Sequence, residues 1–342
     1  MVARLEVARS QILAFRRRMA ALDRRLAPGR RSLRLAAWAG LQDSMPRAAL
    51  LSLHARVRSI RPTALEDPYL IQVWGPRYSV YVVPAPDVAV FTLGRLSDDP
   101  VKRRDAYVLA DRLEALLDGR RMLMGELGRA LGRHSNWLRL AAPTGRLLIH
   151  WDGARQPTIW MVPPPEVDPE TARREMARRY LHVFGPASAE SFAEWAGISA
   201  KAGSATLQSL RRSLTPVATP IGEGWILSRD EAELRADTEI PAPARLLPSG
   251  DTYSLLQGLD RQLLVPDAAH RGLLWTPRVW PGAVLVDGEI VGVWRRAREV
   301  VTVQPWARLP KKARDEVERE AASLPLPGVD REIVVRWEAG PR

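Results

Sequence analysis

A run of three short helices and a hairpin in the second half of the chain constrains the fold most. The first predicted helix ends at the Gly185-Pro186 turn, and Ser188 is the candidate N-cap of the second. The third carries one apolar face, with leucines at i, i+3 and i+7 (Leu207, Leu210 and Leu214). The turn at 222–224 then separates two short apolar segments. Three helices closed by a small hairpin are typical of a winged helix, which is mainly used to hold a helix against DNA.

The same order of elements is predicted twice more, upstream of this unit. In residues 1–100, helices over Arg4 to Leu26, Ser32 to Ala39 and Ala48 to Val57 precede a hairpin at 71–83 with Arg77 at its tip. In residues 101–165, helices at 105–118 and 122–131 precede a hairpin of strands at 137–141 and 147–151, with Arg146 in its turn. Linkers at 163–165 and at Pro241-Ala242-Pro243 bound the third unit, residues 166–240.

Residues 241–342 change from helical to alternating periodicity. Strands are predicted at 283–286, 290–294, 300–304 and 333–337, with an Asp287-Gly288 turn between the first two and one helix at 311–322. We therefore expect an α+β protein of three tandem winged-helix modules followed by a C-terminal β-barrel-like domain.

The charge balance favours a polyanionic partner. The formal net charge is +12, and phosphate neutralisation supplies most of the non-specific affinity of proteins for DNA. Only four of the 51 basic residues are lysine, so the excess is one of arginine, which is also typical of proteins from GC-rich genomes. Two interpretations of the charge remain open at this point: a DNA-binding protein, and a protein-binding protein whose charge is only compositional.

Conventional sites of catalysis are absent from the sequence. The chain has no cysteine, its five histidines are isolated, and no Gly-rich loop ends in Gly-Lys-Ser/Thr. We expect no metal and no cofactor. The first residues lack an apolar signal region and no apolar run approaches the length of a membrane span, so we expect a cytoplasmic, nucleoid-associated protein with no membrane contact.

Three blocks of sequence resemble the AlkZ/YcaQ family of DNA glycosylases. They are Gly40-Leu41-Gln42, the block from Arg179 to Ala187, and the block from Val284 to Arg295, and they occur in the family's order at suitable separations. The segments Leu246-Leu247-Pro248 and 266–271 are also similar to the family's C-terminal domain. The resemblance implies three winged-helix modules and a β-barrel around a concave DNA channel. The implied reaction is hydrolysis of the N-glycosidic bond of bulky N7-alkylated purines, including those tethered in interstrand crosslinks.

The resemblance places the candidate catalytic residues at Gln42, Asp43 and Ser44. The family carries Gln-X-Gln or Gln-X-Asp with a hydrophobic middle residue, whereas here the middle residue is Asp43 and the last is Ser44. N7-alkylation makes the base cationic and a good leaving group, so the enzyme needs to position water and stabilise an oxocarbenium-like sugar. Gln42 could orient the water and Asp43 could act as base, with Ser44 as an auxiliary donor. A helix-capping role for Asp43 or Ser44 is the alternative.

Seven basic residues are the candidate DNA contacts. They lie on or just after the predicted recognition helix (Lys201, Arg211 and Arg212), at predicted hairpin tips (Arg77 and Arg146), or after the C-terminal hairpin (Arg295 and Arg296). The expected partner is duplex DNA that is alkylated or crosslinked. The alternative on the same scaffold is a catalytically inactive DNA-binding protein, a regulator or an adduct-shielding protein, which the altered motif at 43 and 44 favours.

Overall fold

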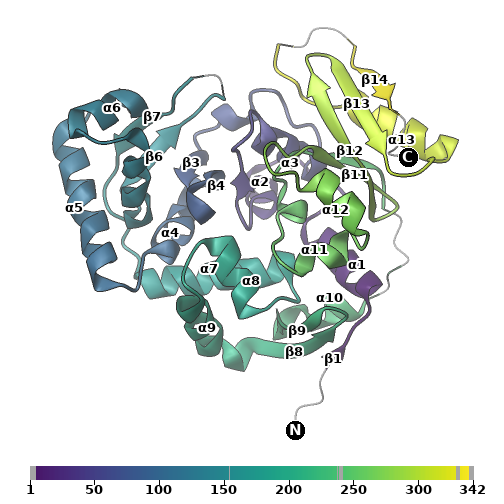
Figure 1. Ribbon diagram of the computed structural model, residues 1–342, viewed down its shortest axis with the longest axis horizontal. Coiled ribbons are helices and arrows are strands. Elements are labelled where there is room, and N and C mark those ends of the chain that lie inside the picture. Colours follow the sequence, from purple (N-terminus) through teal and green to yellow (C-terminus); the bar gives the residue numbers. More distant parts are fainter. Residues whose placement is uncertain (1–4, 154, 237, 239–241, 329–331, 339–342) are drawn as a thin grey trace.

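The computed structural model describes residues 5–153, 155–236, 238, 242–328 and 332–338. Within these residues three β-sheets are joined by helices, which confirms the expected α+β class (Figure 1). The predicted start of the first helix at Arg4 and the predicted linker residue Pro241 lie outside the described residues. In the part of the chain that is described, no helix is long and apolar enough to cross a membrane.

The N-terminal helix is shorter than predicted. Residues Leu5–Glu6 form strand β1, which pairs in parallel with a strand more than 200 residues later, Leu5 opposite Val217. Leu5 and Val7 are buried while Glu6 between them is exposed, and this alternation is that of a strand. The elements that follow up to residue 84 are α1 (Arg9–Met19), α2 (Arg30–Ala36), β2 (Leu41–Gln42), α3 (Ala48–Arg56), β3 (Leu70–Trp74) and β4 (Val80–Pro84).

Strands from the first two predicted units lie together in one six-stranded sheet. Its strand order is β2-β4-β3-β6-β7-β5, and Gln72 of β3 lies opposite Ile149 of β6. The elements of this region are α4 (Val88–Phe91), α5 (Pro100–Leu117), β5 (Met122–Leu123), α6 (Met124–Leu131), β6 (Leu147–His150) and β7 (Thr158–Met161).

The strand predicted at 137–141 is wrong. Residues Ser135–Thr144 form a 3-10 helix, in which Leu138 and Ala141 are buried three residues apart, as the period of that helix requires. Arg146 therefore follows a helix and precedes β6, so it is not in the turn of a hairpin.

The third unit has the predicted order of elements. Ser188 caps the second helix, since its Oγ accepts a hydrogen bond from the Ser191 N–H at 3.1 Å. Tyr180, Phe184 and Trp195 pack together with ring centroids 4.9–5.7 Å apart and join the first two helices. The elements are α7 (Pro169–Phe184), α8 (Ala189–Ala196), α9 (Ala200–Ser209), β8 (Leu214–Thr219), β9 (Gly222–Leu227) and α10 (Glu231–Arg235).

The C-terminal part is an open sheet rather than a closed barrel. Its order is β10-β11-β12-β13-β14, and within the described residues the outer strands β10 and β14 do not pair. Helix α13 covers one face and buries Val317 with Val284 and Val303 of the sheet, so a helix rather than closure of the strands shields the core. The elements are β10 (Arg245–Leu247), α11 (Asp260–Leu264), α12 (Ala268–Leu274), β11 (Gly282–Val286), β12 (Glu289–Ala297), β13 (Val300–Pro305), α13 (Lys311–Ala322) and β14 (Val334–Trp337).

Candidate functional site around Gln42 and Asp43

Gln42 lies at the edge of the six-stranded sheet, between two glycines that allow close packing. Strand β2 places it opposite Tyr81 of β4. Gly40 has a φ of +72°, and a Cβ there would lie 2.9 Å from the Tyr81 ring. A Cβ on Gly250 would lie 3.2 Å from Gln42 Nε2, so only glycine leaves the amide its full space. Gln42 Oε1 is buried and accepts no hydrogen bond from any described residue.

Asp43 is a buried carboxylate that accepts hydrogen bonds at both oxygens. Its side chain is turned inward, and the residue is 3% exposed. Oδ1 accepts the Ala49 N–H at 3.0 Å, and Oδ2 accepts Gln72 Nε2 at 2.9 Å. The same Gln72 amide bonds the backbone of Trp151, donating to its carbonyl at 3.0 Å and accepting its N–H at 2.6 Å. The orientation of the Gln72 amide is therefore defined, and its nitrogen faces Asp43.

The surroundings of Asp43 act on its pKa in opposite directions. Burial raises the pKa of the carboxyl above its ordinary value of 3.8, while the hydrogen bonds from Ala49 and Gln72 lower it, and burial is the larger effect. A carboxylate with a raised pKa is a stronger base than an exposed one.

Asp43 also satisfies the start of α3. The helix begins at Ala48, two residues after the predicted first turn at Pro46, and Asp43 accepts the N–H of its second residue. Ser44 lies in the turn that follows β2, and it is exposed. The site therefore gives Asp43 both the capping contact and a buried position next to Gln42, whereas Ser44 faces solvent.

The C-terminal part of the chain supports this edge of the sheet. Asp251 forms a fully buried ion pair with Arg56 of α3 at 2.7 Å, and Ser52 donates to the same carboxylate at 2.6 Å. Thr252 Oγ1 donates to the Gly40 carbonyl at 3.2 Å. These contacts fix the segment around Gly250 against the Gln42 side chain.

A cationic pocket of about 380 Å³ adjoins the motif. Its walls include Met45 and Pro46 from the turn after β2, Trp280, and Arg295 and Arg296 from β12. Burial and the charge of nearby Arg47 both lower the pKa of Arg296. No described residue forms an ion pair with Arg47, Arg295 or Arg296, and an anion in the pocket would relieve the repulsion between Arg47 and Arg296.

The other predicted DNA contacts lie in separate parts of the molecule. Arg77 is in the turn between β3 and β4 but packs against Gly197 of the third unit, where its Nη1 is buried. Arg146 is bound by Asp111 and Glu114 of α5. Lys201 of α9 and the pair Arg211 and Arg212, which precede β8, are exposed. Figure 1 shows α9 and β8 at its lower edge and β12 at its upper right. The Arg211 guanidinium lies 4.0 Å from the Trp225 ring centroid.

Two residues of the site are missing from the sequence prediction. Gln72 is the one polar residue in the apolar strand β3, which is the signal that marks it. Arg47 adopts the left-handed conformation with φ +66° before α3, and nothing in the sequence marks this position.

Comparisons with a family model, a curated relative and a solved structure each match DNA glycosylases. The family model described as DNA glycosylase AlkZ-like matches residues 35–325. An interstrand DNA cross-link repair glycosylase of Streptomyces sahachiroi is 32% identical over 169 residues, which span 46% of this chain and 43% of that relative. The solved structure of Streptomyces sahachiroi DNA glycosylase AlkZ superposes with a TM-score of 0.78 at 21% identity, covering 98% of this chain and 100% of the other, so the two share a fold.

Proposed function

Because the chain belongs to the AlkZ-like family of DNA glycosylases, we propose that it hydrolyses the N-glycosidic bond of bulky N7-alkylated purines in DNA and unhooks interstrand crosslinks. The observation that carries this proposal is Gln42 Oε1, a buried acceptor that no described residue uses, at the edge of the six-stranded sheet. A buried acceptor without a partner is costly to a fold, and such groups gather at functional sites.

The reaction needs little from the protein beyond placement of water and charge. The N7-alkylated base leaves with the electron pair of the C1′–N9 bond, which neutralises its positive charge. Water adds its oxygen to C1′ and gives up one proton, so the products are the neutral alkylated base and an abasic sugar. Gln42 Oε1 accepts a hydrogen bond from this water and thereby aims its lone pair at C1′.

Asp43 is the proposed base and charge stabiliser. Its buried carboxylate is negative when deprotonated, and a negative charge in a low-dielectric site stabilises the oxocarbenium-like sugar. It then takes up the proton of the attacking water. Ser44, which is exposed, is the proposed auxiliary donor to DNA or to a second water.

Duplex DNA with alkylated or crosslinked bases is the proposed partner, in the cytoplasm and on the nucleoid. We propose three winged-helix modules within residues 1–100, 101–165 and 166–240. The order α7, α8, α9 and then the β8–β9 hairpin supports the third, whose Lys201, Arg211 and Arg212 are the proposed phosphate contacts. Arg295 and Arg296 are proposed to hold a phosphate beside the scissile nucleotide, and Arg77 is proposed to strengthen the field at longer range. Arg146 stays a proposed DNA contact, although Asp111 and Glu114 offset its charge.

A second candidate is a DNA-binding protein that has lost the chemistry. It is favoured by the two hydrogen bonds of Asp43, which satisfy a helix start and Gln72 in the same way that a purely structural carboxylate would. Such a protein would bind adducts or regulate transcription without releasing a base.

A gel assay for abasic sites separates the two. Purified protein is incubated with duplexes that carry N7-methylguanine or a nitrogen-mustard crosslink, and Gln42→Ala is tested beside it. Base release that the substitution abolishes supports the glycosylase. Tight, salt-sensitive binding with no release from either duplex supports the inactive protein, and binding that hardly changes with salt refutes a phosphate-binding role altogether.

A further inference from the structure

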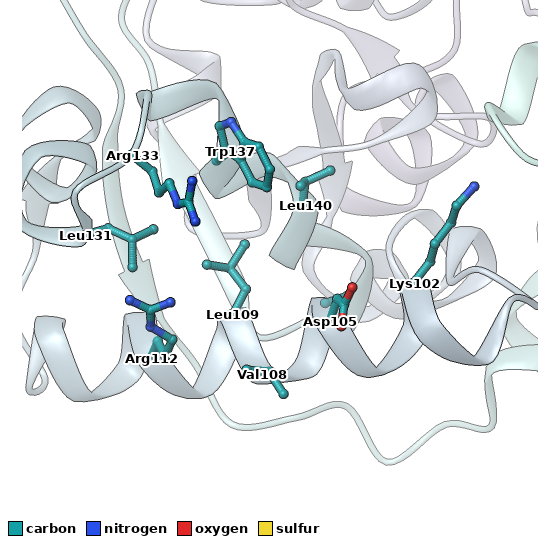
Figure 2. Close-up of a pocket in the computed structure, with 10 residues that line it drawn as sticks. Lys102, Asp105, Val108, Leu109, Arg112, Leu131, Arg133, Trp137 and Leu140 are labelled. Carbon is teal, nitrogen blue, oxygen red and sulfur yellow. The ribbon is translucent and has the colours of Figure 1, made fainter.

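A groove near the β5 edge of the six-stranded sheet, opposite the β2 edge that carries Gln42, has no part in the proposed reaction. It lies between α5 and the 3-10 helix Ser135–Thr144 and has a volume of about 460 Å³. Figure 2 shows Leu131, Trp137 and Leu140 facing Leu109 of α5, with Arg112 and Arg133 at one end and Lys102 at the other. We call this surface the α5 groove.

The groove exposes large apolar side chains that the core does not use. Val108 and Trp137 are each 50% exposed and Leu140 is 42% exposed, whereas Leu138 on the same 3-10 helix is fully buried. The core of this region is therefore complete without them. Apolar side chains that gather in one groove, rather than singly over the surface, favour a binding role for this face.

The ends of the groove carry unpaired positive charge. Within the described residues, Lys102, Arg112 and Arg133 form no ion pair, and the Arg133 guanidinium lies 5.2 Å from the centroid of the Trp137 ring. Asp105 is the one acid among the lining residues, and Arg104 lies 3.5 Å from its carboxylate. The groove is thus apolar along its floor and positive at both ends.

The α5 groove is separate from the candidate catalytic site. Gln42 lies in β2, at one edge of the six-stranded sheet, and β5 and β7, on which α6 and α5 pack, lie at the other edge. Trp137 is the sole aromatic side chain among the lining residues, and the others that are apolar are aliphatic. Surfaces that bind single-stranded nucleic acid stack successive bases on several aromatic rings, so this floor suits leucine- or phenylalanine-sized side chains better than bases.

We propose that the α5 groove docks an acidic peptide segment of a partner protein, with apolar side chains seated over Trp137 and Leu140 and carboxylates at Lys102, Arg112 and Arg133. Charge complementarity selects the acidic flanks and the apolar floor supplies the affinity. A volume of about 460 Å³ holds two or three apolar side chains, as when an amphipathic helix docks in a groove.

A displayed library of random peptides tests this proposal with the full chain as bait. We expect the selected peptides to be rich in Asp, Glu, Leu and Phe. Trp137→Ala should lower the affinity for these peptides by about tenfold or more, as the loss of an interface hot spot does. Arg133→Glu, a surface substitution that no buried contact resists, should weaken them at least as much. Arg129→Glu, an exposed cation outside the groove, should leave binding unchanged.

Three results would overturn the proposal. The first is a selection that yields no peptide dependent on Trp137 or Arg133. The second is a set of selected peptides enriched in Lys and Arg. The third is a loss of affinity for a short oligothymidylate in Trp137→Ala that is as large as the loss of affinity for the peptides, which would make the groove a nucleic-acid site. Base release from alkylated duplexes should be unchanged in both groove variants, whatever its level in the unaltered protein.

Discussion

Replacing Asp43 with asparagine removes the one side-chain type that fits its position. Both of its partners are donors, the Ala49 N–H at 3.0 Å and Gln72 Nε2 at 2.9 Å, and an ionised carboxylate accepts at both oxygens. An asparagine amide presents one oxygen and one NH₂, so either orientation sets a donor against a donor. Gln72 cannot turn to compensate, because Trp151 binds both ends of its amide.

The size of the effect differs between stability and catalysis. One buried donor without an acceptor costs about 1–3 kcal/mol, which a domain with about 5–15 kcal/mol of stability survives. Loss of a general base costs about 10²–10⁴ in rate, equal to about 3–5 kcal/mol of activation free energy. Asp43→Asn should therefore fold and bind DNA, yet release the base at a rate about a hundredfold or more below that of the unaltered protein.

Single-turnover base release as a function of pH is the assay. Burial raises the Asp43 pKa, so the rate of the unaltered protein should fall at a pH above the ordinary range of aspartate. This fall of the rate at acid pH should be absent from Asp43→Asn.

The stability of the two proteins should also respond differently to pH. As the pH rises above 3.8, the unaltered protein should lose stability relative to Asp43→Asn, because the folded carboxyl binds its proton more tightly than the unfolded one. Asp168→Asn is the control, because Asp168 accepts the Thr171 N–H at the start of α7 and so caps a helix outside the site. Release by Asp43→Asn within threefold of the unaltered rate, about 0.6 kcal/mol, would refute its role as base.

Gly250→Ala should slow base release about tenfold at unchanged DNA affinity, because φ is +71° there and the new Cβ would lie 3.2 Å from Gln42 Nε2. Arg56→Ala should lower the free energy of unfolding by about 3–5 kcal/mol in a denaturant titration, because it leaves the Asp251 carboxylate buried without its cation. Arg296→Gln should reduce the slope of log K for duplex DNA against log salt by about 0.9, if it neutralises one phosphate.

Each of these predictions has a control in the same chain. Arg146→Ala breaks two ion pairs whose acids are 57–66% exposed, so it should cost about 1 kcal/mol or less. A loss as large as that of Arg56→Ala would contradict the burial argument. Arg129→Gln should leave the salt slope unchanged. A normal rate in Gly250→Ala would show that the Gln42 amide does not need its observed position.

Local signals predicted most of the elements but not their assembly. The cap at Ser188 and the Asp287-Gly288 turn are visible in sequence because their chemistry involves neighbouring residues. Pairing of β1 with β8 joins residues more than 200 positions apart, and no local pattern encodes such a contact. The sequence predicts a strand at 137–141, inside the 3-10 helix at 135–144, because such a short apolar run fits both periods.

The candidate site divides in the same way. Gln42, Asp43 and Ser44 were found through a resemblance to a family, and their residue types alone would have indicated a helix cap. The pairing of Asp43 with Gln72 and the approach of Gly250 to Gln42 depend on how β3 and the segment after β10 fold against β2. Burial of Asp43, which decides its pKa, is likewise a property of the assembled sheet.

Mass spectrometry of the free base is the most direct measurement of the central proposal. A duplex with a single N7-methylguanine is incubated with excess protein, and 7-methylguanine is quantified in the filtrate for the unaltered chain and for Gln42→Ala. We expect release by the unaltered chain and a loss of about 10²-fold or more in the variant, with equal duplex binding by both. Equal release by both proteins, or no release by either from a bound duplex, would contradict a glycosylase that works through Gln42.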